Sequence, residues 1–159
     1  MHLFDGPTPL EALAHMSQHL GRPRTPPPWI FAPWNDAIFG SDEVRAFAFF
    51  LRDNDIPSSA IWSEDWRGGK DSGDLYRLDE DWRLDRELYP DYEELAAELR
   101  ELGIAPQVYF NTFVTQGGDV FDEITAAGHA IKDERGAPLL FTGVDKSFSP
   151  TALVDLTND

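Results

Sequence analysis

Apolar residues recur along the chain at helical spacing first and at strand spacing later. After Thr8, leucine and alanine at positions 10, 13, 14 and 20 keep the spacing of one helix face. Thr8 and Glu11 form a capping box, with proline at the first helical position, and Gly21 ends the pattern. The proline-rich segment 22–28 then predicts a stiff, extended connector. Residues 1–28 are therefore expected to be a leading helix and a connector.

Three apolar, strand-like runs follow, and each is followed by a helical pattern. The runs cover residues 29–34, 56–66 and 104–111, and helical spacing covers 41–54, 90–103 and 119–128. Strands that alternate with helices indicate parallel strands joined by right-handed crossovers. We therefore predict an α/β fold. The polar and irregular segment 67–89 is assigned to no element.

The last part of the chain has a different pattern. Residues 130–143 predict a hairpin that turns near Arg135 and Gly136, and residues 151–159 form a final apolar run. No repeat marks a second domain, so residues 1–159 are expected to form one. Three parallel strands are few for a complete sheet, and a (β/α)8 barrel needs about 250 residues. We therefore predict a partial (β/α)8 barrel, with residues 29–159 supplying its first strands and a hairpin excursion.

Composition narrows the classes of partner. The chain is 42% apolar and 13% aromatic, enough for a core, and its formal net charge is -16. Such a charge repels phosphates, so we expect neither nucleic acid nor a membrane surface as a partner. The absence of cysteine excludes thiolate chemistry and agrees with the cytoplasmic location that we expect. The sequence shows no membrane-spanning run, and its first residues do not have the pattern of a signal peptide.

Polar and aromatic side chains occur at the ends of the strand-like runs. They are the segment 34–36, the group Trp62, Glu64 and Trp66, and Asn111. Ligands of parallel α/β folds bind beyond the carboxyl ends of the strands. Carboxylates and amides can bind vicinal hydroxyls, and tryptophan rings can cover the apolar face of a sugar. The pattern thus predicts a sugar-binding corner; the alternative is a solvated acidic loop beside core tryptophans.

Other motifs are weaker. His15 and His19 are four residues apart, but no HExxH pattern accompanies them, so we expect them on a helix surface. The segment 68–70 lacks the remainder of a phosphate-binding loop, and Gly117 and Gly118 lack the dinucleotide fingerprint. No serine, histidine and aspartate arrangement suggests a nucleophile. These patterns predict no metal site.

Four segments, taken in order, carry a family resemblance. They are "GRPRTPPPWIFAPW", "GSDEVRAFAFFLRDNDIPSSAIWSEDWRGG", "YPDYEELAAELRELGIAPQVYFNTFV" and "VDLTND". Together they resemble glycoside hydrolase family 31, which contains α-glucosidases, α-xylosidases and sulfoquinovosidases, over nearly the whole chain. The resemblance implies a retaining α-glycosidase on a (β/α)8 barrel that uses no cofactor and takes a carbohydrate substrate.

The resemblance also implies roles for the strand-end residues. Glu64 matches the acid that contacts hydroxyls of the sugar in the −1 subsite, Trp62 and Trp66 would flank it, and Asn111 would lie at a neighbouring strand end. These residues are our predicted substrate-binding group, together with Arg77.

The layout is most similar to the sulfoquinovosidase branch, which differs at two places. That branch has glutamine at the position of Glu64, and it holds the sulfonate with an arginine and a tryptophan three residues apart. Arg77 matches the arginine, whereas the tryptophan position is Glu80. Because an acid there would repel a sulfonate, we expect a neutral α-glycoside.

Hydrolysis needs residues that this sequence does not supply in a suitable pattern. Retaining glycosidases use two carboxyl groups roughly 5–5.5 Å apart. Glu64 and Asp65 are adjacent in the expected strand, so their side chains should point to opposite faces. The resemblance places both catalytic aspartates after the segment that matches "VDLTND". We therefore predict no catalytic residue in this chain and no hydrolysis by it alone.

Three interpretations remain open at this point. The first is the front part of an α-glycosidase barrel. The second is a non-catalytic barrel remnant that binds carbohydrate or acts as an oligomeric structural protein, associating with itself through exposed barrel edges. The third is a complete small α/β enzyme of unrelated chemistry.

Overall fold

The computed structural model describes residues 2–71, 73, 76–142 and 150–158. The chain divides into two compact units, Met1–Ile30 and Phe31–Asp159. Three predicted segments extend beyond the described residues: the excursion at 72 and 74–75, the hairpin at Gly143, and the last run at Asp159.

The first unit contains the predicted leading helix. Helix α1 spans Pro9–Leu20, and the Thr8 hydroxyl accepts from the Glu11 backbone N–H at 3.3 Å, which confirms the cap. No residue of α1 is buried, and Leu10 remains 78% exposed. The apolar face of this helix thus has no core within its own unit.

The strand predicted over 29–34 is wrong in position. Residues Pro28–Phe31 form a short 3-10 helix η1, in which the Ile30 N–H donates to the Pro27 carbonyl at 3.1 Å. The first strand, β1, is Trp34–Asp36. Pro33 has no N–H to donate, but its carbonyl accepts from the Ser59 N–H at 2.9 Å, so pairing with the neighbouring strand begins at Pro33 and β1 follows it.

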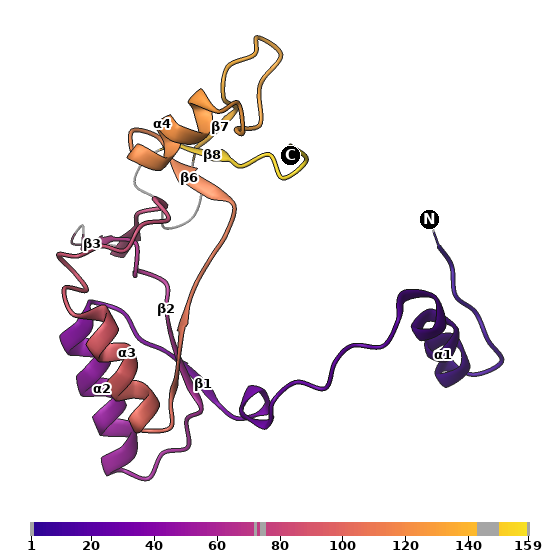
Figure 1. Cartoon of the computed structure of the whole chain (residues 1–159), viewed down its shortest axis with the longest axis horizontal. Coiled ribbons are helices and arrows are strands. Elements are labelled where there is room, and N and C mark those ends of the chain that lie inside the picture. The colour runs from indigo at the N-terminus through magenta and orange to yellow at the C-terminus, as the bar shows by residue number, and fades with distance from the viewer. Residues whose placement is uncertain (1, 72, 74–75, 143–149, 159) are drawn as a thin grey trace. The chain divides into compact units, whose positions relative to one another are not determined.

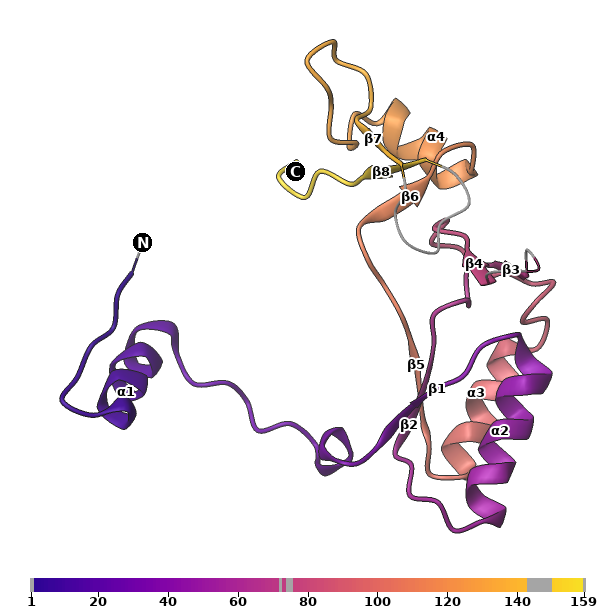
Figure 2. The ribbon, with the colours of Figure 1, turned by 180° about the vertical axis from the view of Figure 1, so that it is seen from behind.

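The second unit is built on a parallel sheet with the order β1-β2-β5. Strand β2 is Ala60–Ser63 and β5 is Ala105–Val108, and both pair in parallel as the alternation predicted. Helices α2 (Ser41–Asp53) and α3 (Tyr92–Glu101) lie side by side on one flank of this sheet (Figures 1 and 2). The fold is α/β, and its described parallel strands do not close a barrel.

The core fills the space between the sheet and these two helices. Helix α2 contributes Val44, Ala48 and Leu51, whose spacing places them on one face. Strand β2 supplies Ile61, and α3 supplies Leu95 and Leu99. The connecting segments supply the remainder of the cluster, which comprises Ala37, Trp66, Tyr89 and Ile104.

The unassigned segment between β2 and α3 contains an antiparallel hairpin. Its strands are β3 (Gly69–Asp71) and β4 (Tyr76–Leu78). In both views the hairpin lies beyond the end of the parallel sheet at which the strands finish, between that sheet and α4 (Figures 1 and 2). The segment therefore forms part of the surroundings of the strand ends.

A second small sheet follows β5. It has the order β6-β8-β7, with all pairs antiparallel, and α4 (Asp119–Ala126) packs against it. The strands are β6 (Phe113–Thr115), β7 (Leu140–Phe141) and β8 (Thr151–Leu153). The turn predicted near Arg135 and Gly136 is present, since the Gly136 N–H donates to the Asp133 carbonyl at 3.0 Å. Lys132 and Pro138 form an antiparallel bridge across it, whereas β7 pairs with β8.

Candidate functional site

The carboxyl ends of the parallel strands bring one row of side chains together. Asp36, Trp62 and Gln107 lie in register across β1, β2 and β5. Ile61 belongs to the core under the helices, so the row at Trp62 is on the opposite face of the sheet. Trp62 is half-buried there, and its ring centroid lies 5.7 Å from that of Tyr109. A half-exposed tryptophan is thus available beside the strand ends.

Glu64 and Asp65 follow β2 directly. The strand ends at Ser63, so these acids lie in the turn after it and not in the strand as expected. The turn is closed by the Gly68 N–H, which donates to the Asp65 carbonyl at 2.9 Å. Glu64 is only 7% exposed. Its carboxylate is therefore largely removed from bulk water at the edge where we expect a ligand.

Asp65 has a structural role. Its Oδ2 accepts from the Phe39 N–H at 2.7 Å and from the Tyr76 hydroxyl at 2.6 Å, and its Oδ1 accepts from the Tyr89 hydroxyl. Burial, together with the hydrogen bond to Asp65, raises the pKa of Tyr76, and the same causes raise the pKa of Tyr89. Both oxygens of this buried acid are thus occupied by donors, which leaves it unsuited to act as a nucleophile.

Glu80 forms a buried ion pair with Arg67. The side chains are 5% and 0% exposed, and the pair joins the turn after β2 to the residues after β4. Burial lowers the pKa of Arg67 and raises that of Glu80, against the opposing effect of each partner's charge. The expected repulsion of a sulfonate by Glu80 is therefore wrong as a physical reason, because Arg67 compensates this charge inside the protein.

The other predicted residues occupy three different environments. Trp66 is buried in the core, and its indole N–H donates to the Tyr109 carbonyl at 2.7 Å. Asn111 lies after β5, where its Oδ1 accepts from the Phe113 N–H at 3.0 Å. Arg77 is on β4, directly opposite Lys70. The structure thus places Trp62 and Glu64 at the strand ends, Trp66 beneath them, and Arg77 on the hairpin.

Two residues of this region were missed in the sequence. Tyr109 packs between Trp62 and the guanidinium of Arg67, whose central carbon lies 5.6 Å from the Tyr109 ring centroid. Tyr109 lies within the predicted run 104–111, as Glu64 lies within the run 56–66, and in the structure each directly follows the strand. This position near a strand end was the only signal for Tyr109. Arg67 had none, because its partner Glu80 lies beyond the hairpin.

A polar cavity of about 260 Å³ lies between the hairpin and the β6–α4 connection. Asp79 and Asp81 line it, and burial followed by the charge of Asp81 raises the pKa of Asp79. The two glycine motifs noted in the sequence, the segment 68–70 and the pair Gly117 and Gly118, both reach this cavity. Its other lining residues are Lys70, Thr115, Gln116, Gly117 and Gly118. These motifs therefore contribute to the packing between hairpin and small sheet.

Two further properties concern the described part of the chain. Within residues 2–71, 73, 76–142 and 150–158, no three histidine or acidic side chains are grouped closely enough to hold a metal ion. Among the helices formed by these residues, none has the length and apolar character needed to cross a bilayer.

Sequence comparisons find relatives over nearly all of the chain. A model of the glycosyl hydrolases family 31 TIM-barrel domain matches residues 23–159. A sulfoquinovosidase of Agrobacterium fabrum is 30% identical over 161 residues, which cover 99% of this chain and 23% of the relative. An α-xylosidase, XylQ, of Lactiplantibacillus pentosus is 29% identical over 140 residues, covering 85% of this chain and 18% of the relative. The chain thus spans less than a quarter of the length of these proteins.

Solved structures agree with this match. A family 31 sulfoquinovosidase from E. rectale, in complex with an aza-sugar inhibitor, superposes with a TM-score of 0.81 and 26% identity, covering 94% of this chain and 22% of that one. An α-xylosidase from a soil metagenome, complexed with xylose, gives a TM-score of 0.77 at 22% identity, covering 96% and 21%. The second likeness concerns the fold alone.

Proposed function

Because this chain belongs to glycosyl hydrolase family 31, we propose that it supplies the first strands and a −1 subsite wall of a retaining α-glycosidase barrel. The observation that carries the proposal is the half-exposed Trp62 beside the acid Glu64 at the carboxyl end of the sheet. An aromatic ring and a carboxylate at one edge suit the apolar face and the hydroxyls of one sugar ring.

The five predicted residues would divide this work. Trp62 would cover the sugar and Glu64 would accept from its hydroxyls, while Trp66 would support the strand end from the core. Asn111 and Arg77 would border the site from β5 and from the hairpin. Their placement at or beyond the carboxyl ends of parallel strands supports these roles, because ligands of this architecture bind there.

We propose that the catalytic carboxylates are not among the residues of this chain. Retaining hydrolysis needs a nucleophile and an acid/base roughly 5–5.5 Å apart. Asp65 is the acid next to Glu64, and its oxygens accept from Phe39, Tyr76 and Tyr89. An acid held in this way is suited to positioning loops rather than to attacking an anomeric carbon.

A neutral α-glycoside remains the substrate class that we propose. The argument against a sulfonate is now that position 80 is not a tryptophan, because the charge of Glu80 is compensated by Arg67. The sulfonate site implied by the family resemblance needs a tryptophan there, whereas this chain has Glu80 buried against Arg67. Arg77 alone would lack that partner.

The test measures the binding of glycosides to the 159-residue chain by protein-observed NMR. We expect methyl α-xyloside or methyl α-glucoside to shift the Trp62 indole signal, and methyl α-sulfoquinovoside to bind more weakly. Trp62→Ala and Glu64→Gln should each weaken binding about tenfold, the effect of losing one stacking or charged hydrogen-bond contact.

Trp34→Ala is the matched control. The sequence pattern placed Trp34 at the end of a strand, but Trp34 begins β1, on the same sheet face as Trp62 and at the opposite end of the strands. Its affinity should equal that of the wild type. No saturable binding of any of the three glycosides would overturn the sugar-binding role. Release of nitrophenol from aryl α-glycosides by the purified chain would overturn the proposed absence of catalytic carboxylates.

A further inference from the structure

The ion pair between Arg67 and Glu80 is too deeply buried to contact a ligand. Their side chains are 0% and 5% exposed, so neither is part of the surface of the strand-end site. A buried ion pair is costly to desolvate, and apolar residues of similar size often give equal or greater stability. Its presence here therefore calls for an explanation other than the stability of the fold.

The pair contacts three segments that meet at the strand ends. Arg67 follows β2, Glu80 follows β4, and Arg67 Nη1 lies 3.5 Å from Asn111 Oδ1 in the segment after β5. Glu80 is fixed by its backbone, since its N–H donates to the Thr115 hydroxyl at 3.0 Å and its carbonyl accepts from the Thr115 N–H at 3.1 Å. The guanidinium is thus held in one place relative to all three segments.

The Arg67 guanidinium also contacts the ring of Tyr109. Its central carbon lies 5.6 Å from the Tyr109 ring centroid, within the distance for a cation–π contact. The backbone of Tyr109 is held separately, because the Trp66 indole donates to its carbonyl at 2.7 Å. The other neighbour of the Tyr109 ring is Trp62, at 5.7 Å between centroids. Contacts therefore run in sequence from Glu80 through Arg67 and Tyr109 to Trp62.

We propose that Arg67, held by Glu80, is a positioning residue that fixes the Tyr109 ring and through it the orientation of Trp62. This role rests on the proposed function only in so far as Trp62 is taken to contact a sugar. The orientation of the two rings is a property of the protein without ligand, so it can be measured whether or not a sugar binds.

The principal variant is the double substitution Arg67→Met and Glu80→Leu, which leaves no buried charge without a partner. Arg67→Lys is the second variant, since it keeps the charge but loses the planar group that lies over Tyr109. The readouts are thermal unfolding, the aromatic near-UV circular dichroism, and nuclear Overhauser contacts between the Trp62 and Tyr109 rings.

We expect both variants to unfold cooperatively while their Trp62–Tyr109 contacts weaken or disappear. Affinity for methyl α-xyloside or methyl α-glucoside should fall about threefold to tenfold, the effect expected from losing one aromatic pair. Arg83→Met is the matched control, since it removes an exposed arginine that pairs with Asp119 and Glu123, and it should leave contacts and affinity unchanged. Tyr109→Ala should reproduce the loss, and adding it to the double variant should cause no further loss.

Two results would overturn the proposal. One is a folded double variant with ring contacts equal to those of the wild type. The other is failure of both variants to fold, which would make the pair a requirement of the fold as a whole. If the wild type binds none of the glycosides, the proposed function fails, and the ring contacts alone decide this inference.

Discussion

The Tyr76 hydroxyl donates to Oδ2 of Asp65 at 2.6 Å, and this contact ties the β3–β4 hairpin to the turn after β2. The same carboxylate accepts from Tyr89, just before α3, and from the Phe39 backbone after β1. One fully buried acid therefore holds three segments: the hairpin, the residues before α3 and the residues after β1.

Asp65→Ala should lower the free energy of unfolding by roughly 3 kcal/mol, because it leaves buried donors without an acceptor. Urea unfolding at pH 7 measures this. Tyr76→Phe removes one donor and keeps the ring, so its cost should be about 1 kcal/mol. An equal cost for the two variants would contradict a role for Asp65 in holding all three segments.

Gly40 is expected to tolerate no side chain. Its φ is 93° at the start of α2, and an added Cβ would lie 2.6 Å from the Leu88 carbonyl oxygen. Gly40→Ala should cost about 2–4 kcal/mol, from backbone strain and from the clash together. Gly136 has φ 82° with no atom within 4 Å of an added Cβ, so Gly136→Ala should cost only about 1–2 kcal/mol. Both variants introduce backbone strain, and only Gly40→Ala introduces the clash. The difference between their melting temperatures therefore reports the contribution of the clash.

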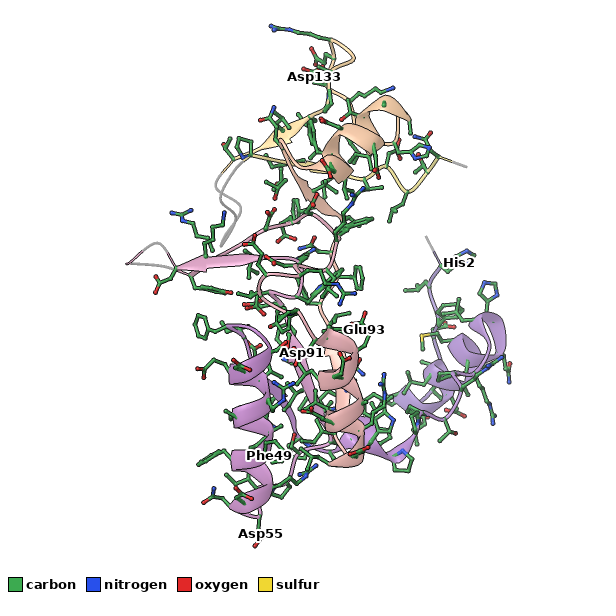
Figure 3. The ribbon with its side chains drawn as sticks, turned by 60° about the vertical axis from the view of Figure 1, so that its left-hand side comes forward. His2, Phe49, Asp55, Asp91, Glu93 and Asp133 are labelled. Atoms are coloured by element: carbon green, nitrogen blue, oxygen red, sulfur yellow. The ribbon has the colours of Figure 1, made fainter. Side chains whose placement is uncertain are left out.

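Arg45 connects α2 to α3 and should contribute measurably to their packing. It donates to Glu98 at 2.6 Å and to Asp91 at 2.5 Å, and Asp91 is labelled at the start of α3 in Figure 3. Arg45→Met should lower the free energy of unfolding by about 1–2 kcal/mol, mainly through lost charged hydrogen bonds. Arg83→Met, which removes more exposed pairs with Asp119 and Glu123, should produce no measurable change. High salt should narrow the difference between Arg45→Met and the wild type.

Glu93 should titrate at unusually low pH. Arg86 donates to both of its carboxylate oxygens, at 2.7 and 2.6 Å, and lowers the pKa of Glu93 from 4.5 to about 2. A lowered pKa stabilises the fold above pH 4.5, and this stabilisation is lost as the pH falls toward about 2. NMR titration should therefore show the Glu93 carboxyl midpoint rising in Arg86→Gln. The pH-dependence of unfolding should change only in that acidic window, and a change confined to neutral pH would contradict this assignment.

The regular elements could be predicted where one local pattern was sufficient. Val44, Ala48 and Leu51 show helical spacing, and that spacing is what buries them in α2. The first strand was misplaced because "WIFAPW" is apolar throughout, and this pattern does not distinguish the 3-10 helix at Pro28–Phe31 from a strand. Pro33, which lacks an N–H, marks the boundary between the two. The apolar side chains of α1 had the correct period, but period alone does not reveal whether a helix has a partner within its unit.

The position of two candidate site residues could also be predicted from a local pattern. Trp62 and Glu64 lie at a strand end, as predicted, and residues there share the edge where the strands end. Their contact with a sugar stays a prediction. Arg67 pairs with Glu80 because the β3–β4 hairpin brings the chain back to the turn after β2, and the path of the hairpin depends on contacts such as that of Tyr76 with Asp65. These contacts join residues that are distant in the sequence, so a local sequence pattern does not reveal them.

The parallel sheet described above has β1 at one side and β5 at the other, and each pairs with a single neighbour among the described strands. Backbone groups along an outer strand can pair with any strand that reaches them, from the same molecule or from another. For this 159-residue chain, we therefore expect protein concentration to act as a variable of folding, as denaturant and temperature do. The melting temperature measured at one protein concentration would therefore hold for that concentration alone, and a dilution series is needed to describe the stability of the chain.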